Sequence, residues 1–123
     1  MRVLLIDDNP AFLQAVASLV RVWGNVDVVT VATSGEEGLA RAAEEDPDLV
    51  LVDVVMPGLD GFETARRLKA LPQPARVFVI SLSDQPPYYR AAAQAGADGF
   101  VAKANLARVL AGLLGSEKES ERG

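Results

Sequence analysis

The chain has 123 residues, of which 50% are hydrophobic and 24% are charged, and its net charge at pH 7 is −5. This length and composition are typical of one globular domain with a single core, and leave no room for a second folded domain. The acidic charge argues against direct binding to nucleic acid, and the absence of cysteine and histidine excludes disulfides, thiolate zinc sites and histidine bases. Any chemistry must therefore depend on carboxylates, hydroxyls and lysine.

The apolar runs of the sequence are too short to cross a bilayer. The first of them, Met1–Ile6, passes directly into Asp7 and Asp8, without the long apolar region and cleavage site of a secretory signal. We therefore expect a cytoplasmic protein without a membrane segment.

The first third of the chain predicts a strand, a helix and a second strand. Val3–Ile6 is an apolar run of strand length, and Asn9 then has the position of a helix N-cap. The helix places Phe12 and other large apolar residues on one face, and we expect Gly24 to end it. The second strand is predicted over Val26–Val31.

A second helix and a third strand follow. Ser34 and Glu37 have the spacing of a capping box, in which the serine caps the helix and the glutamate reaches back to the cap. Pro47 cannot continue a helix, so the second helix is expected to end before it. The third strand is predicted over Leu49–Val52, an apolar run that stops at Asp53.

The second half of the chain continues the alternation of helix and strand, with proline and glycine residues at the element ends. The expected elements are a helix from Asp60 to the residues before Pro72, a strand Val77–Ile80, a helix Pro87–Ala95, a strand Gly99–Ala102 and a helix Asn105–Leu114. The charged residues 116–123 are expected to form a disordered tail.

Five strands that alternate with helices predict a parallel sheet, because parallel neighbours must be joined by long crossover connections. The strands are almost continuously apolar, which indicates burial on both faces. With right-handed crossovers, helices cover both faces and the chain forms a doubly wound α/β domain. The ligand site of such a domain lies beyond the carboxyl ends of its strands.

Polar side chains stand at the carboxyl ends of four predicted strands, which a parallel sheet brings together. They are Asp7, Asp8, Asp53, Ser81 and Lys103. Each has an ordinary alternative role, as a helix cap, a turn hydroxyl or a solvated surface lysine. However, three clustered carboxylates repel each other by roughly 4 kcal/mol per pair at about 4 Å and an effective dielectric near 20. A purely structural role does not explain such an arrangement.

A hard divalent cation would relieve this repulsion, and oxygen ligands in a chain without cysteine or histidine suit Mg²⁺. Magnesium in turn favours phosphate. A carboxylate beside it can attack a phosphoryl donor and form an acyl phosphate, while a lysine and a hydroxyl hold the remaining oxygens. The polar residues therefore indicate phosphoryl chemistry at this edge of the sheet.

Four stretches of the sequence resemble the response-regulator receiver domain of two-component signalling, in its stand-alone form like the chemotaxis regulators. They are Leu4–Asn9, Val52–Gly61, Ile80–Ser81 and Ala95–Lys103, and their order and spacing agree with the family. The resemblance covers residues 2–115. It implies a flavodoxin-like sheet of strand order 2-1-3-4-5 with five helices, and one receiver domain over residues 1–115 followed by the polar tail.

The resemblance also implies a metal and phosphoryl site. Asp53 would be the phosphoacceptor. Asp8, Asp53 and the backbone carbonyl of Val55 would bind Mg²⁺, and Asp7 would help through a water.

A conformational switch is implied in the same way. Ser81 would contact the phosphoryl group, Lys103 would pair with the acceptor and then with phosphate, and Phe100 would follow Ser81 inward. The face made by the fourth helix, fifth strand and fifth helix would bind a downstream protein target or form a phosphorylation-dependent homodimer. Tyr88 and Tyr89 are candidate contacts on that face, with a role in the core or at its solvent edge as the open alternative.

The function that the resemblance implies is that of a phosphoacceptor in a phosphorelay, and not of an enzyme acting on other substrates. The phosphoryl group would come from a histidine kinase or a phosphotransfer protein. Three positions depart from the family. Ala104 replaces the usual proline, Leu82 replaces a small residue at the pocket entrance, and Val55 has no group to position an attacking water.

Two other functions remain open. Leu82 and Ala104 favour a pseudo-receiver, which would bind partners without phosphorylation, although all five polar residues of the predicted site are present. A hydrolytic phosphatase with an aspartyl-phosphate intermediate typically has a second acid two residues after its nucleophile. Val55 occupies that place.

Overall fold

The computed structural model describes residues 1–23, 25–83 and 85–122. Over these residues, strands and helices alternate along the chain. Their bounds are β1 Arg2–Ile6, α1 Pro10–Arg21, β2 Val28–Ala32, α2 Gly35–Glu45, β3 Leu49–Asp53, α3 Gly61–Lys69, β4 Arg76–Ser81, α4 Pro86–Gln94, β5 Gly99–Ala102 and α5 Leu106–Arg122, with a short 3₁₀ turn over Lys103–Asn105.

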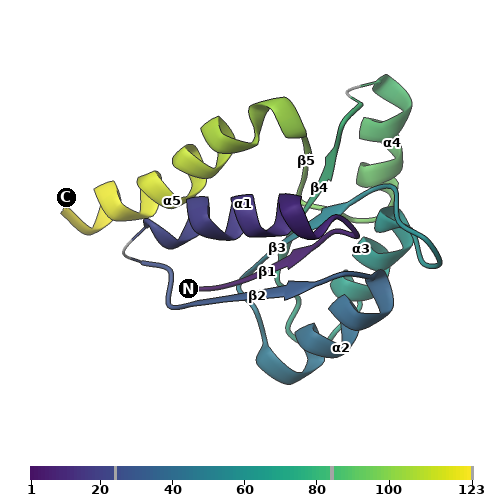
Figure 1. Ribbon diagram of the computed structural model, residues 1–123, viewed down its shortest axis with the longest axis horizontal. Helices are drawn as coiled ribbons and strands as arrows, with labels where there is room; N and C mark the ends of the chain where they lie inside the picture. Colours follow the sequence, from purple (N-terminus) through teal and green to yellow (C-terminus); the bar gives the residue numbers. More distant parts are fainter. Residues whose placement is uncertain (24, 84, 123) are drawn as a thin grey trace.

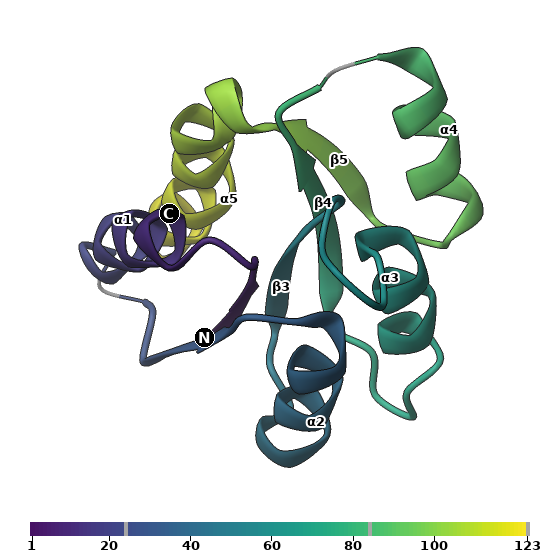
Figure 2. The same ribbon diagram turned by 45° about the vertical axis from the view of Figure 1, so that its right-hand side comes forward.

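The strands form one parallel sheet of order β2-β1-β3-β4-β5. Helices α1 and α5 cover one face and α2, α3 and α4 cover the other, as Figure 1 and the turned view of Figure 2 show. The predicted doubly wound α/β fold, with its flavodoxin-like strand order, is therefore confirmed. The direction of winding reverses between β1 and β3, which is where ligand sites of this fold lie.

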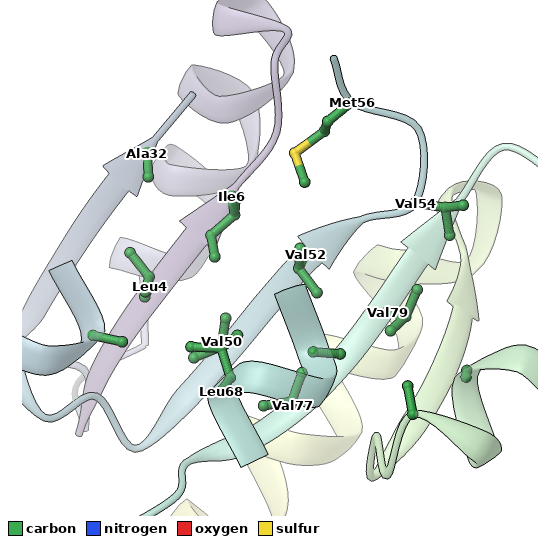
Figure 3. Close-up of a cluster of buried hydrophobic side chains, with 14 residues drawn as sticks. Leu4, Ile6, Ala32, Val50, Val52, Val54, Met56, Leu68, Val77 and Val79 are labelled. Carbon is green, nitrogen blue, oxygen red and sulfur yellow. The ribbon is translucent and has the colours of Figure 1, made fainter. Parts of the chain in front are cut away.

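Two apolar clusters form the core, one on each face of the sheet. Successive residues of a strand point to opposite faces, so the central strands β1 and β3 contribute to both clusters. Their residues are Leu4, Ile6, Val50 and Val52 on the side of α2, α3 and α4 (Figure 3), and Val3, Leu5, Leu49 and Leu51 on the side of α1 and α5. All are at most 2% exposed, which confirms that these strands are buried on both faces.

The second strand starts later than predicted. The sequence predicts a start at Val26, but β2 begins at Val28 and ends at Ala32. The N–H of Val26 donates to the carbonyl of Trp23 at 3.1 Å, so this residue belongs to the turn after α1 rather than to the sheet. Hydrophobicity alone does not distinguish a turn valine from a strand valine.

The third and fourth strands extend one residue further than predicted. Asp53 is the last residue of β3 and pairs with Ile80, and Ser81 is the last residue of β4 and pairs with Ala102. Two predicted site residues are therefore held by the sheet itself, which fixes their backbone positions.

Side-chain caps fix the starts of the first helices as predicted. The side-chain oxygen of Asn9 accepts hydrogen bonds from the N–H groups of Ala11 and Phe12 at 3.0 and 3.2 Å. Helix α1 ends at Arg21, and Gly24, the predicted end, lies outside the described residues.

The second helix has the predicted serine cap, because the hydroxyl of Ser34 accepts from the N–H of Glu37 at 3.1 Å. The Glu37 carboxylate accepts a hydrogen bond from the hydroxyl of Thr33 at 3.4 Å. Helix α2 ends at Glu45, ahead of Pro47 as predicted. Helix α4 starts and ends one residue earlier than expected.

The fifth helix is longer than predicted. The sequence predicts an end at Leu114, before Gly115, but α5 continues to Arg122. Helix α5 thus runs into the segment predicted as a disordered tail, and the disorder of residues 116–123 stays a prediction. One glycine costs a helix only about 1 kcal/mol, and the segment after it is rich in glutamate, lysine and arginine, which favour helix. The boundary of the domain at residue 115 stays a prediction.

Candidate functional site

The predicted site residues meet at the carboxyl edge of the sheet. Asp7 follows β1, Asp53 ends β3, Ser81 ends β4 and Lys103 follows β5. A pocket of about 340 Å³ opens at this edge. Its lining consists of Asp7, Asp8, Asn9, Asp53, Val55, Ser81, Leu82, Ser83, Tyr88 and Lys103. All the polar residues that the sequence analysis singled out are therefore brought together.

Three carboxylates form the acidic part of the pocket. Asp7 and Asp53 are buried, with 1% and 6% of their surface exposed, whereas Asp8 is exposed. One carboxylate oxygen from each of the three lies within 4.8 Å of the others. Their hard oxygen donors and close spacing fit Mg²⁺, and Val55 lines the same pocket.

The acidic cluster changes the ionisation of Asp53. The pKa of its carboxyl is raised from 3.8 to about 6. Burial is the largest cause, the negative charge of Asp7 is the second, and Lys103 acts in the opposite direction. Repulsion between the acids, which the sequence predicts, is therefore present, and desolvation is the larger effect.

Lys103 bridges the two buried acids. Its ammonium Nζ lies 2.9 Å from Oδ2 of Asp7 and 3.4 Å from Oδ1 of Asp53. The second oxygen of Asp7 accepts from the N–H of Asn9 at 2.9 Å. The resemblance implied a pair between Lys103 and Asp53, and the structure adds a shorter contact to Asp7.

The remaining pocket residues differ in exposure. Ser81 is buried, and its hydroxyl accepts a hydrogen bond from the N–H of Ser83 at 3.1 Å. Leu82 and Val55 are 88% and 70% exposed. The pocket therefore has a polar floor and two apolar side chains at its rim.

Residues 3–113 match the family model of the response regulator receiver domain. The chain belongs to this family. It is 38% identical over 101 residues to the nitrate/nitrite response regulator protein NarL of Escherichia coli, covering 82% of this chain and 47% of that protein. It is also 43% identical over 108 residues to a gliding motility regulatory protein of Myxococcus xanthus, covering 86% of this chain and 14% of that protein.

Solved receiver structures agree with this assignment. The signal receiver domain of NarL from Mycobacterium tuberculosis has a TM-score of 0.83 at 32% identity, over 99% of this chain and 96% of that one. The chemotaxis response regulator CheY4 of Vibrio cholerae has a TM-score of 0.82 at 26% identity, over 94% and 96%. The receiver spans about half the length of the NarL-type relatives it matches. Within its described part, no helix is both long and apolar enough to cross a membrane.

A glycine at the start of α3, which the sequence marks only as part of a helix start, packs directly against the end of β3. The N–H of Gly61 donates to the carbonyl of Val54 at 2.9 Å. A Cβ atom at Gly61 would lie 2.1 Å from the backbone oxygen of Asp53. The start of α3 can therefore approach β3 only because residue 61 has no side chain.

Four aromatic rings form a stack beside the pocket of the receiver. Tyr88 lies between Phe62 and Phe100, with ring centroids 6.1 and 6.5 Å away, and Tyr89 contacts Phe100 at 4.5 Å. Tyr88 is half-buried and also lines the acidic pocket, whereas Tyr89 is 47% exposed. The two tyrosines therefore have different positions. Tyr88 packs against the core, and Tyr89 is available at the surface.

The environment of Lys103 includes an aromatic ring beside its ammonium and a trans peptide bond that follows it. Its ammonium lies 4.1 Å from the centre of the Phe12 ring, a contact that the sequence analysis missed because it assigned Phe12 only to a core face. The peptide bond before Ala104 is not cis, since no cis bond occurs among the described residues, and the chain turns directly into the 3₁₀ segment. With alanine instead of proline at position 104, the bond between Lys103 and Ala104 is therefore a trans peptide bond.

Proposed function

We propose that this receiver accepts a phosphoryl group on Asp53 from a histidine kinase or a phosphotransfer protein. The observation that carries the proposal is the position of Asp53, whose carboxylate lies within 4.8 Å of Asp7 and Asp8 and 3.4 Å from the ammonium of Lys103. A buried carboxylate beside two acids and one lysine can attack a phosphoryl donor when a metal ion neutralises the negative charge of the phosphoryl oxygens.

The reaction is a displacement at phosphorus. A carboxylate oxygen of Asp53 forms the new bond to phosphorus, while the bond from phosphorus to the donor nitrogen or oxygen breaks. The departing group keeps the electron pair and takes a proton from solvent. The raised pKa of Asp53 leaves its carboxyl ionised above about pH 6, so the nucleophile is available at neutral pH.

Side chains around Asp53 have separate roles in the proposal. Mg²⁺, held by Asp8, Asp53 and the Val55 carbonyl, would supply charge neutralisation for the phosphoryl oxygens. The ammonium of Lys103 would move from the carboxylates to a phosphoryl oxygen. The hydroxyl of Ser81 would donate a hydrogen bond to a second phosphoryl oxygen, after its present hydrogen bond from the N–H of Ser83 breaks.

The phosphorylated state would be recognised through α4, β5 and α5. Phe100 belongs to β5 and touches both tyrosines of α4, so a movement of Ser81 and Phe100 would change the surface that carries Tyr89. The target on this face is a protein of unknown identity, and a homodimer through the same face is the alternative assembly.

A pseudo-receiver is the second candidate function. The specific observation in its favour is Leu82, which lines the pocket at its rim and stands where the family has a small residue. The hydrolytic phosphatase lacks support, because Val55 provides no acid where that mechanism needs one.

Intact-mass measurement after incubation with phosphoramidate and Mg²⁺ tests these functions. The receiver predicts one added phosphoryl group that persists after the donor is removed, whereas a phosphatase would turn over repeatedly. Asp53→Asn should abolish the addition and Asp46→Asn should retain it, because Asp46 is exposed and Asn tolerates its left-handed backbone. If neither phosphoramidate nor a purified phosphotransfer domain adds phosphate, the pseudo-receiver is correct.

A further inference from the structure

The Lys103 ammonium is held on two sides by different kinds of group. The carboxylates of Asp7 and Asp53 lie at 2.9 and 3.4 Å, and the ring centre of Phe12 lies at 4.1 Å. Only 14% of the lysine side chain is exposed, so little water reaches the ammonium. The aromatic ring therefore takes a place that solvent would otherwise occupy.

We propose that Phe12 is a positioning residue, whose ring holds the Lys103 ammonium by a cation–π interaction and thereby sets the affinity of the pocket for a phosphoryl group. The inference rests on the proposed function of Asp53 as phosphoacceptor. It adds Phe12, in the first turn of α1 and outside the four quoted sequence motifs, to the residues that act on the transferred group.

The chemistry of the ammonium explains why a ring is suitable at this position. Lysine has three N–H donors and no acceptor, and two of its neighbours here are the carboxylates of Asp7 and Asp53. The face of an aromatic ring attracts a cation without a directional hydrogen bond, and the attraction is strongest where water is excluded. The ammonium can therefore move from Asp7 to a phosphoryl oxygen while it stays in contact with Phe12.

A carboxylate or hydroxyl at the same place would act differently. An additional acid would compete with the phosphoryl oxygens for Lys103, and an aliphatic side chain would leave the ammonium without a favourable contact on that side. The ring thus limits the positions of the ammonium and does not compete with the phosphoryl oxygens for its hydrogen bonds.

Ordinary packing is the competing explanation, because Phe12 also contacts the core cluster on the α1 and α5 side. The two explanations differ in their dependence on the charge distribution of the ring. Fluorination of phenylalanine weakens the negative face of the ring and changes its size little, so it removes the cation–π interaction and leaves the packing nearly intact.

The test replaces Phe12 with mono-, tri- and pentafluorinated phenylalanine by site-specific incorporation, and measures binding of fluoroberyllate, an analogue of the phosphoryl group, at saturating Mg²⁺. We expect a progressive loss of fluoroberyllate affinity along the series, reaching roughly three- to tenfold. The affinity for Mg²⁺ alone should stay within about twofold, since Lys103 does not bind the cation. The same analogues at Phe78 serve as the matched control. The guanidinium of Arg76 lies 5.6 Å from the centre of the Phe78 ring, and Phe78 does not line the pocket.

A double-mutant cycle supplies the second readout. Phe12→Leu should weaken fluoroberyllate binding when Lys103 is present and have no further effect in a Lys103→Met background. Equal binding across the fluorinated series, or an equal effect of Phe12→Leu in both backgrounds, overturns the inference and leaves the proposed function standing. If the unmodified protein binds no fluoroberyllate, the proposed function and the inference are both overturned.

Discussion

At the scale of single residues, the proposed function of Asp53 has a cost in stability. Its pKa is 3.8 in an unperturbed chain and about 6 in the folded protein, because folding buries the carboxyl beside Asp7. The folded state therefore holds this proton more tightly than the unfolded state does. Without metal, stability should fall as the pH rises from about 4 to about 6 and remain lower above that range, by an amount on the order of 3 kcal/mol.

The first prediction is that Asp53→Asn stabilises the metal-free protein at neutral pH. The amide carries no charge, so urea unfolding in EDTA at pH 7.5 should show a gain of about 1 to 2 kcal/mol over wild type, after allowance for the lost contact to Lys103. At pH 4, where the carboxyl is protonated in the folded state, the gain should disappear. Asp46→Asn, which changes an exposed acid, is the control. A variant that is less stable than wild type at both pH values would contradict the cost assigned to Asp53.

The second prediction concerns Val55 and the lifetime of the acyl phosphate. Val55 is 70% exposed beside the pocket and cannot orient a water for hydrolysis. Val55→Asn or Val55→Glu should shorten the lifetime of the phosphorylated protein severalfold, measured as loss of the added mass in Mg²⁺. Val22→Asn changes a valine of similar exposure outside the pocket and should leave the lifetime as it is. An unchanged lifetime in both Val55 variants would remove Val55 as its determinant.

At the scale of elements, the site depends on close contacts between the start of α3 and the end of β3. The Asp60 side chain caps α3 through the N–H of Glu63 at 2.8 Å, and Gly61 lies against the backbone of Asp53. The position of Asp53, the proposed phosphoacceptor, is therefore coupled to the packing of a neighbouring helix as well as to its own strand.

The third prediction is that Gly61→Ala is strongly destabilising. The new Cβ would meet backbone atoms, which cannot move aside as a flexible side chain can, so we expect a loss of about 3 kcal/mol in the free energy of unfolding. Gly112→Ala is the matched control: beyond the adjacent residues and the nearby backbone of its own helix, no atom lies within 4 Å of the new Cβ, and the substitution should stabilise α5 by up to about 1 kcal/mol. Denaturant titration of both variants measures the difference. Equal stability of the two would show that α3 moves away from β3 without cost.

The sequence predicts elements well where one kind of signal dominates. Central strands such as Leu49–Asp53 are continuously apolar and buried on both faces, and Asn9 and Ser34 mark helix starts through local hydrogen bonds. The start of β2 depends on a turn hydrogen bond of Val26, and the end of α5 depends on whether one glycine outweighs the helix formers after it. These two boundaries depend on small differences between competing local interactions, and hydrophobic periodicity does not predict such differences.

At the scale of the whole molecule, the parallel sheet brings five polar residues from four separate segments of the chain into one pocket. Strand order and the rule for parallel sheets predict that convergence, whereas the contact of Lys103 with Phe12 depends on side-chain directions across 91 residues of chain. The shorter pairing of Lys103 with Asp7 has the same origin. Proximity of residues could thus be predicted from topology, but the choice of partner within the pocket could not.

The fourth prediction is that Mg²⁺ stabilises the folded protein through the acidic cluster. A ligand that binds only the folded state raises stability by RT ln(1 + [L]/Kd), so the midpoint of thermal melts should shift upward as the Mg²⁺ concentration increases. The shift should be smaller for Asp8→Asn than for wild type, and unchanged for Asp46→Asn. Identical shifts in all three proteins would place the cation elsewhere.

Localisation of the phosphoryl group tests the central claim most directly. After incubation with phosphoramidate and Mg²⁺, borohydride reduction converts a phosphorylated aspartate to homoserine, which peptide sequencing by mass spectrometry assigns to one position. The account predicts homoserine at position 53, and none in the Asp53→Asn variant. Homoserine at Asp7 or Asp8, or a phosphorylated protein without homoserine at position 53, would contradict it.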